Sequence, residues 1–205
     1  LFGQHVSPQV VERLMLEGKG AESDIRRVAV MFVDFRSFTA GARDRSPQEV
    51  VDRLDGAFAV LVDILDRHGG IVNKFLGDGF LALFGAPLEA PDPAHHAVAA
   101  AREMLEANDR VNRQTAWPLR IGIGIHIGEV VAGSIGSPRR KEYTVIGDTV
   151  NFASRIEALN KEFNSQLLVS QAVWEALGEQ ARDAVALGEV PIRGYDRPMA
   201  VWRLG

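Results

Sequence analysis

Two aspartates occupy positions where a carboxylate could take part in chemistry. Asp34 directly follows VAVMFV, residues 28–33, a continuous apolar run that predicts a strand buried on both faces. Asp78 stands between two glycines in NKFLGDGFLALF, residues 73–84, and Asp-Gly between apolar runs predicts a hairpin. Two carboxylates that converge at the end of a sheet can hold two hard cations, as phosphoryl-transfer enzymes require. The alternative is that Asp34 caps one turn and Asp78 shapes another.

Two further groups of residues add polar contacts to this set. In Phe35-Arg36-Ser37-Phe38-Thr39, a turn would aim successive backbone amides at an anion. Asn151 and Arg155 are four residues apart on a predicted helix, so both point the same way. The apolar stripe of that helix lies beside the pair, which would place both polar groups at the edge of a cleft. A solvated helix face would explain the same spacing. The stripe consists of Phe152, Ala153, Ile156 and Leu159.

The elements that position these residues follow from helix caps and periodicity. Ser46, Pro47 and Glu49 form a capping box that opens a long helix, and Gly69-Gly70 ends it. Asp92-Pro93 opens a second long helix. The patterns further along predict a strand at 119–132 with glycines at alternate positions, a strand at 143–146, a helix from Asp148 or Thr149 to about Leu159, a strand at 166–169, a helix at 171–177 and a closing hairpin.

The first part of the chain therefore runs strand, helix, strand, strand, helix, strand. This order is the βαββαβ pattern of a ferredoxin-like sheet with helices packed on one face. We expect an α+β fold with a mainly antiparallel sheet, followed by a C-terminal extension and hairpin. In such a sheet the first strand and the 73–84 hairpin are expected to lie close together, which would bring Asp34 near Asp78.

Composition and charge disfavour several classes of protein. Of 205 residues, 46% are hydrophobic and 24% are charged, which is typical of a globular domain that can bury a sizeable core. The net charge of −4 argues against a nucleic-acid partner bound through a broad basic face. The chain has no cysteine, so it forms neither disulfides nor thiolate metal sites. No apolar run reaches the ~18–20 residues that cross a membrane, and we expect a cytoplasmic location for this domain.

The beginning of the chain predicts a lead-in to the main domain. Residues 1–27 contain a predicted short helix that starts at Ser7-Pro8, followed by a linker, and residues 28–205 form the main domain. The chain opens on Leu1 rather than Met, so we expect a piece of a longer protein with a sensor or membrane segment upstream.

Three blocks in register resemble one known family. FVDFRSFT, NKFLGDGFLALFG and YTVIGDTVNFASRIE are similar to the signature blocks of the class III nucleotidyl cyclase catalytic domain. GIGIHIGEVVAG and the lead-in LFGQHVSPQVVERLM are similar to bacterial members of that family. The resemblance covers about residues 28 to 203 in the family's order, and three blocks in order are far more specific than one.

The resemblance implies a role for each candidate residue. Asp34 and Asp78 match the two metal-binding aspartates, with the Phe35 carbonyl as a further ligand, for two divalent cations per site, Mg²⁺ or Mn²⁺. Asn151 and Arg155 match the pair that orients the ribose and stabilises the transition state. The turn amides around Ser37, Phe38 and Thr39 would hold the β- and γ-phosphates.

The same resemblance implies how the purine is read. Lys74 matches the lysine that contacts adenine, and Thr144 matches the second purine-reading position, where many members have Asp and a bacterial subgroup has Thr. One position departs from the pattern, because Arg193 stands where the family's terminal hairpin usually carries a lysine for the triphosphate. Arg and Lys differ in shape and hydrogen bonding, so the two residues are not interchangeable.

The spacing of Lys74 and Asp78 raises the question of how many sites they serve. Four strand residues span up to ~13 Å, so an extended nucleotide could reach both, or each residue could face a different site. The resemblance implies the second arrangement, in which two domains pair head to tail and share both sites. The chain carries both sets of residues, which predicts a homodimer with two equivalent sites.

The resemblance predicts an adenylate cyclase that converts ATP to 3′,5′-cyclic AMP and pyrophosphate. The alternatives are a guanylate cyclase or a cyclase with loose purine choice, and a non-catalytic domain that binds a nucleotide for regulation. A diguanylate cyclase of the GGDEF type is a more distant alternative, because the run that gives it its name is absent. His126 is expected to be a satisfied structural group, and Glu49, Asp52, Asp55 and Glu129 are expected to be surface charges.

Overall fold

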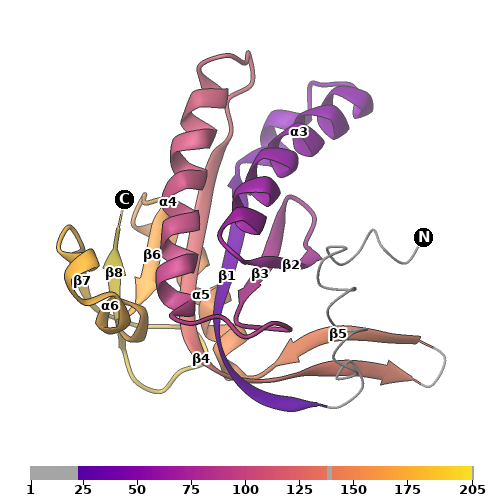
Figure 1. The fold of residues 1–205 in the computed structure, drawn as a ribbon. Helices are drawn as coiled ribbons and strands as arrows, with labels where there is room; N and C mark the ends of the chain where they lie inside the picture. The colour runs from indigo at the N-terminus through magenta and orange to yellow at the C-terminus, as the bar shows by residue number, and fades with distance from the viewer. Residues whose placement is uncertain (1–22, 138–139, 205) are drawn as a thin grey trace.

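The computed structural model describes residues 23–137 and 140–204. The lead-in helix predicted after Ser7-Pro8 lies outside the described residues. The described residues form one eight-stranded sheet with the order β2-β3-β1-β4-β6-β8-β7, in which β5 pairs with β4 (Figure 1). No helix among the described residues is long and apolar enough to cross a membrane.

The elements from β1 to β4, apart from one short additional helix, confirm the predicted βαββαβ core. β1 pairs antiparallel with β3 and with β4, and β2 pairs antiparallel with β3. A short helix, α2 (Phe38–Ala42), was not predicted and lies between β1 and the first long helix. The core elements are β1 (Asp24–Arg36), α3 (Pro47–Arg67), β2 (Ile71–Phe75), β3 (Gly79–Phe84), α4 (Pro93–Asn112) and β4 (Arg120–Ser137).

The second part of the chain extends the sheet on the β4 side. β6 pairs parallel with β4, and the predicted closing hairpin is present as the antiparallel pair β7–β8. β4 runs five residues beyond the predicted end at 132, because it goes on pairing with β5 as far as Ser137. The elements are β5 (Arg140–Ile146), α5 (Asp148–Glu162), β6 (Leu167–Ser170), α6 (Gln171–Leu177), the 3₁₀ helix η2 (Gly178–Ala181), β7 (Val185–Val190) and β8 (Met199–Arg203).

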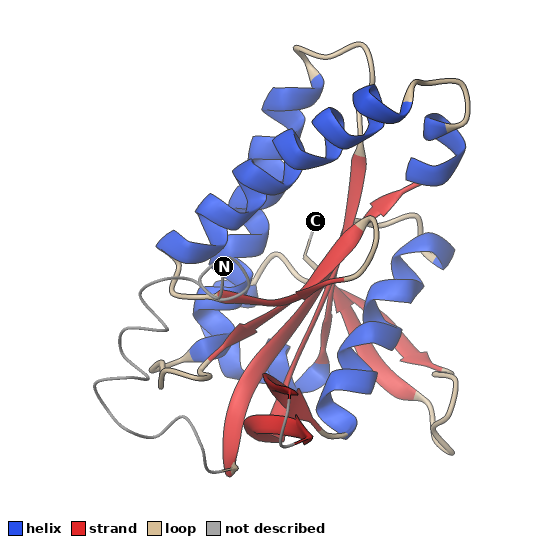
Figure 2. Cartoon of the chain, turned by 90° about the vertical axis from the view of Figure 1, so that its right-hand side faces the viewer, coloured by secondary structure: helices blue, strands red, loops and turns tan. Residues whose placement is uncertain are grey.

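Helices cover both faces of the sheet (Figure 2). α3 and α4 pack on one face, as the βαββαβ pattern predicts, over a cluster that includes Ala29, Met31 and Val33 of β1. α5 packs on the opposite face, where Val28 and Val30 of β1 belong to a second cluster. β1 is therefore buried on both sides, which is why its sequence is a continuous apolar run.

The helix ends confirm the capping prediction for α3. The Ser46 hydroxyl accepts a hydrogen bond from the Glu49 amide at 3.3 Å, and the Glu49 carboxylate accepts one from the Ser46 amide at 2.9 Å. This reciprocal pair satisfies two amides that the first turn of a helix leaves unpaired. The helix that follows supplies one wall of the core beneath β1.

Three glycines of β4 form the surface on which α5 rests. A β-carbon at Gly124 would lie 2.3 Å from the backbone nitrogen of Glu157, and one at Gly128 would lie 2.5 Å from the Thr149 hydroxyl. A β-carbon at Gly122 would lie 2.5 Å from the Arg36 guanidinium. The alternation seen in the sequence therefore marks the face of the strand that α5 approaches closely.

Candidate active site

Asp34 and Asp78 come together at one end of the sheet. Asp34 is paired with Gly79 in the β1–β3 ladder, and the Phe35 amide donates to the Asp78 carbonyl at 2.9 Å. The two carboxyl groups are close enough for the Asp78 carboxylate to raise the pKa of Asp34. The expectation that the first strand and the hairpin converge is confirmed.

Glycine is required on each side of Asp78 for a different physical reason. Gly77 adopts φ 69°, a left-handed conformation that an L side chain rarely adopts. A β-carbon at Gly79 would lie 2.3 Å from the Val33 carbonyl oxygen, so only glycine lets β3 approach β1 this closely. The tight turn and the short approach together hold Asp78 against Asp34.

The charges at this pair fit a bound cation. Burial and, to a smaller extent, the neighbouring Asp78 carboxylate raise the pKa of Asp34 to about 6, against the opposing effect of Arg36. Two adjacent carboxylates that resist ionisation together gain most from a cation between them. The described residues contain no group of three or more acidic or histidine ligands. Two carboxylates with nearby backbone carbonyls would suit Mg²⁺ or Mn²⁺ that takes its remaining ligands from water and phosphate, and the predicted metal role of Asp34, Asp78 and the Phe35 carbonyl stays a prediction.

An ion pair that the sequence did not reveal lies next to Asp34. The Arg36 guanidinium contacts the Glu157 carboxylate of α5 and also donates to the Glu157 carbonyl at 2.9 Å. Its other amino group lies 3.9 Å from the Asp34 carboxylate. Burial raises the pKa of Glu157 to about 7, although Arg36 opposes the shift. The sequence alone placed Arg36 only in the predicted phosphate-binding turn. The alternating glycines of β4, which let α5 reach Arg36, were the one sequence feature that indicated this contact.

The turn after Asp34 is fixed by an aromatic anchor. Ser37 has φ 57°, so the chain reverses there and α2 begins at Phe38. The Phe38 ring is buried and stacks on Trp117 with 5.2 Å between ring centroids, and the Arg45 guanidinium lies over the Trp117 ring, 4.3 Å from its centroid. Thr39 is exposed. The predicted phosphate-binding role of these turn amides stays a prediction.

Asn151 and Arg155 lie exposed on α5. Within the described ranges, 23–137 and 140–204, neither side chain forms a hydrogen bond or ion pair with the protein. The predicted apolar stripe beside them is buried and consists of Phe152, Ala153, Ile156 and Leu159. The pair is therefore available to a ligand or to another chain.

The loop that carries Arg193 lies along α5. Tyr195, two residues further on, donates to the Asp148 carboxylate at 2.7 Å, and its ring packs on Phe152 at 5.1 Å. Arg155 acts on Tyr195 electrostatically, while burial and Asp148 raise the pKa of that phenol to about 12. Arg193 is exposed and forms no ion pair with any residue that the structure describes, and its predicted role toward the triphosphate stays a prediction.

Lys74 and Thr144 are linked through their neighbours. The Asn73 carboxamide donates to the Tyr143 carbonyl at 3.2 Å, so β2 is tied to β5 although the two strands are not adjacent in the sheet. Neither the Lys74 ammonium nor the Thr144 hydroxyl forms a hydrogen bond with any residue that the structure describes. The resemblance predicted that both residues read the purine, and that role stays a prediction; the sequence gave no sign of this link.

The residues expected to be structural behave as predicted. The His126 ring shares a hydrogen bond of 2.8 Å with the Ser170 hydroxyl and packs edge-on against Phe152. Burial lowers the pKa of His126 to about 4, so the ring is neutral at physiological pH. Glu49, Asp52, Asp55 and Glu129 are exposed.

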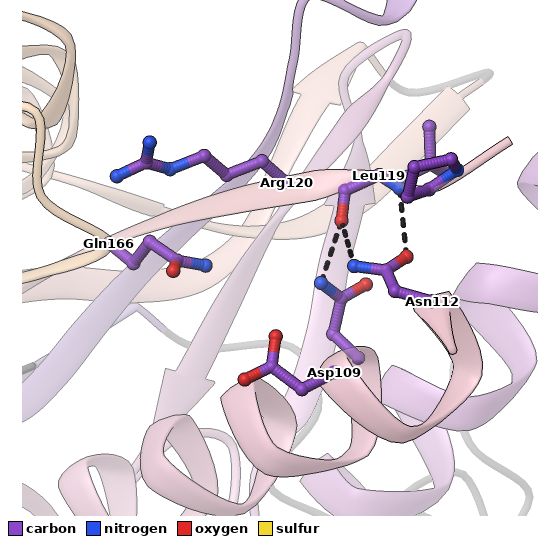
Figure 3. Close-up of a pocket in the computed structure, with 7 residues that line it drawn as sticks. Asp109, Asn112, Leu119, Arg120 and Gln166 are labelled. Atoms are coloured by element: carbon purple, nitrogen blue, oxygen red, sulfur yellow. Dashed lines mark hydrogen bonds between the residues drawn. The ribbon is translucent and has the colours of Figure 1, made fainter.

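A depression of about 480 Å³ lies elsewhere, between the end of α4 and the start of β4 (Figure 3). Two of its polar side chains already bond to the protein, since the Asn108 and Asn112 amides both donate to the Leu119 carbonyl, at 2.7 and 2.8 Å. None of the candidate residues lines it. We therefore assign this depression to the loop that joins α4 to β4 rather than to the site.

Comparison with known proteins identifies the class of this domain. Residues 21–204 match the adenylate and guanylate cyclase catalytic domain family, so the chain belongs to that family and is a class III nucleotidyl cyclase domain. The uncharacterized protein Rv1318c of Mycobacterium tuberculosis is 41% identical over 200 residues, which cover 97% of this chain and 36% of that protein. The chain thus spans about a third of the length of the curated relatives it matches.

Solved structures of both substrate classes resemble this chain. The guanylyl cyclase Cya2 is 36% identical with a TM-score of 0.79, covering 88% of this chain and 92% of that one. The adenylyl cyclase CyaB from P. aeruginosa is 26% identical with a TM-score of 0.81, covering 89% and 95%. The fold and family are common to the two, and the choice of purine has to be argued from the site.

Proposed function

We propose that this domain is an adenylate cyclase that converts ATP to 3′,5′-cyclic AMP and pyrophosphate. The observation that carries the proposal is the lysine at position 74, which is unpaired within the described residues and linked through Asn73 to the strand of Thr144. A lysine ammonium can donate a hydrogen bond to N1 of adenine, an acceptor, but not to N1 of guanine, which carries a proton. A guanylate cyclase would be expected to carry an acidic residue at position 74.

The protein residues divide the work of the reaction. The ribose 3′-oxygen forms a bond to the α-phosphorus, the bond from that phosphorus to the β-phosphate oxygen breaks, pyrophosphate leaves and the hydroxyl proton passes to solvent. Asn151 orients the ribose, and Arg155 neutralises charge that develops in the transition state, which is the main help an enzyme gives phosphoryl transfer. The turn amides from Ser37 to Thr39 and the Arg193 guanidinium hold the triphosphate.

Asp34, Asp78 and the Phe35 carbonyl are the residues that would hold two divalent cations. When bound, these cations lower the pKa of the 3′-hydroxyl and neutralise the triphosphate. The paired carboxylates and the raised pKa of Asp34 support this role, because a cation relieves the repulsion that burial creates.

A homodimer with two shared sites accounts for the two separate groups of residues. Asp34 and Asp78 close one end of the sheet, whereas Asn151 and Arg155 face outward from α5 with no partner in the described part of the chain. We propose that each chain supplies its metal ligands to one site and its purine- and ribose-binding residues to the other. The lengths of the relatives further suggest that the complete protein carries additional segments, among them an upstream sensor or membrane domain, with this domain in the cytoplasm.

Guanylate cyclase activity is the second candidate, because Cya2, a guanylyl cyclase, is 36% identical to this chain. Thr144 can donate and accept a hydrogen bond, so that position is compatible with either purine. The test is to measure turnover of ATP and GTP side by side with Mn²⁺. We expect cyclic AMP to form with a higher kcat/KM than cyclic GMP; comparable values would overturn the assignment of adenine. Asp78→Ala, which removes a metal ligand, should abolish both activities.

A further inference from the structure

We infer that Asn73 is a positioning residue that sets purine selectivity by holding Lys74 and Thr144 at a fixed spacing. This inference rests on the proposed function, in which these two residues read the base. Asn73 does not itself have to touch the nucleotide.

The Asn73–Tyr143 hydrogen bond joins the residues that directly precede Lys74 and Thr144. Asn73 directly precedes Lys74, and its carboxamide nitrogen donates to the Tyr143 carbonyl at 3.2 Å. That carbonyl belongs to the peptide unit that continues into Thr144. The hydrogen bond therefore connects the backbone immediately before one purine-reading residue to the backbone immediately before the other.

A bulge in β2 directs the Asn73 side chain toward β5. Val72 pairs with Ala82 and Lys74 with Leu81, so two steps along β2 correspond to one step along β3. Asn73 is the extra residue, and such bulges bend a strand and re-aim a side chain. In a regular strand, successive side chains point to opposite faces of the sheet, so without the bulge the Asn73 side chain would point in a different direction.

No second hydrogen bond joins β2 to residues 143–146 of β5, the part of that strand whose side chains the structure describes. β2 is at one end of the sheet order, and β5 lies off the path, paired only with β4. Ile71 and Tyr143 belong to the same apolar cluster, which holds the two strands together but does not fix their register. Apolar packing is non-directional, whereas a hydrogen bond specifies which atoms meet.

The carboxamide is an unfavourable choice for packing alone. The Asn73 oxygen is buried and has no hydrogen-bond partner. A buried acceptor without a donor lowers stability, and an apolar side chain would avoid that loss. The donor on the same carboxamide, which reaches Tyr143, is the feature that an apolar residue would not supply.

Among the described residues, no hydrogen-bond partner holds the side chains of Lys74 and Thr144 in place. Neither forms a hydrogen bond with any residue that the structure describes. Their relative position is consequently set by their backbones, and the Asn73–Tyr143 bond is the polar tie between those backbones.

The test compares selectivity in Asn73→Asp and Asn73→Ala with that of the unmodified chain. Asp has the shape of Asn but places an oxygen against the Tyr143 carbonyl. We expect the ratio of kcat/KM for ATP to that for GTP to fall about three- to tenfold, as loss of one hydrogen bond would produce. The change should be mainly in KM for ATP, because the metal ligands and Arg155 lie on other elements. In a Lys74→Ala background, Asn73→Asp should change the ratio no further.

The matched control is Asn108→Asp. Asn108 is a buried asparagine whose carboxamide also donates to a backbone carbonyl, that of Leu119 at 2.7 Å, away from the site. Its substitution should lower the melting temperature and reduce both activities equally, leaving the ratio unchanged. A smaller amount of folded protein lowers both activities by the same factor and leaves the ratio of kcat/KM for ATP to that for GTP unchanged. Partial unfolding of a variant therefore does not mimic the expected result.

These measurements distinguish a failure of the Asn73 inference from a failure of the proposed cyclase function. If the unmodified chain is active, Asp78→Ala is inactive and both Asn73 variants keep the original ratio, Asn73 is only structural and the inference is wrong. If the unmodified chain neither turns over ATP or GTP nor binds either in competition with a fluorescent nucleotide, the proposed function fails and the inference fails with it. A lowered ratio that needs Lys74 supports the inference.

Discussion

Arg36 of β1 and Glu157 of α5 form an ion pair beside the Asp34 carboxylate. Their side chains are only 18% and 13% exposed, and Arg36 bonds both to the Glu157 carboxylate and to its backbone carbonyl. One guanidinium therefore lies between a candidate metal ligand and the helix that carries Asn151 and Arg155. The pair links the two groups of site residues within one chain.

Removing the Glu157 carboxylate should destabilise the fold. Glu157→Ala leaves the Arg36 charge mostly buried and without its partner, which typically costs about 3–5 kcal/mol of unfolding free energy. Glu157→Gln keeps a hydrogen-bond acceptor and should lose less. Urea denaturation measures both. Glu129→Ala, at an exposed position of β4, is the control and should change stability by no more than about 0.5 kcal/mol. Equal losses for Glu129→Ala and Glu157→Ala would show that the buried pair has no special role.

Asp34→Asn should stabilise the protein while it abolishes turnover. The pKa of Asp34 is raised to about 6 from its ordinary 3.8, so above pH 6 the folded state carries an ionised carboxylate that it disfavours. Because the side chain is 36% exposed, the gain at pH 7.5 should be only on the order of 1 kcal/mol.

Added Mn²⁺ gives the same variant a second readout. Binding to the folded state alone raises its melting temperature, so Mn²⁺ should stabilise the unmodified chain and not Asp34→Asn. Thermal melts with and without Mn²⁺ measure this directly. An equal shift in both proteins would place the cation somewhere other than the Asp34–Asp78 pair.

Mixing two inactive variants should restore activity if sites are shared. Asp78→Ala removes a proposed metal ligand and Arg155→Ala removes the cation proposed to stabilise the transition state, so each variant alone should be inactive. Half of randomly exchanged dimers are mixed, and each mixed dimer has one intact site, which predicts about a quarter of the original activity. A mixture of Asp34→Ala with Asp78→Ala should stay inactive. Each chain then lacks one of its two metal ligands, so neither site of a mixed dimer is intact. Silence of the first mixture, with subunit exchange verified, would contradict shared sites.

His126 should make the fold sensitive to acid. Its pKa is lowered from 6.5 to about 4, so between these values the unfolded chain binds a proton that the folded chain excludes. Stability should therefore fall as pH falls from 6.5 to 4, by an amount on the order of 3 kcal/mol. His126→Gln lacks this titration, and its stability should depend less steeply on pH in that window. Denaturant melts at several pH values compare the two; parallel curves would contradict burial of a neutral ring.

The predictable parts of the fold are those written in local sequence. The capping box at Ser46, the Gly-Asp-Gly turn and the continuous apolar run at residues 28–33 act over a few positions, so they predicted α3, the β2–β3 hairpin and the burial of both faces of β1 correctly. Asp34 and Asp78 could be brought together from the order of elements alone. The five extra residues of β4 were missed because pairing with β5, rather than apolar content, extends the strand.

The unpredicted parts of the site join residues far apart in the chain. Arg36 and Glu157 are 121 positions apart, and Asn73 and Tyr143 are 70 apart. A charged or amide side chain gives no sign in sequence of which partner it meets, since its local pattern is the same whether it is solvated or paired. Only the approach of α5 to β4, and of β5 to β2, decides these contacts.

The glycines beneath α5 also bear on how freely this chain can vary. At positions 122 and 124 a β-carbon would come within 2.5 and 2.3 Å of Arg36 and of the Glu157 backbone. In a library of random substitutions, these two sites should be among the least tolerant, although neither would touch a substrate. Selection for activity would then act strongly on β4, although this strand carries none of the proposed reacting groups, because β4 must leave space for α5.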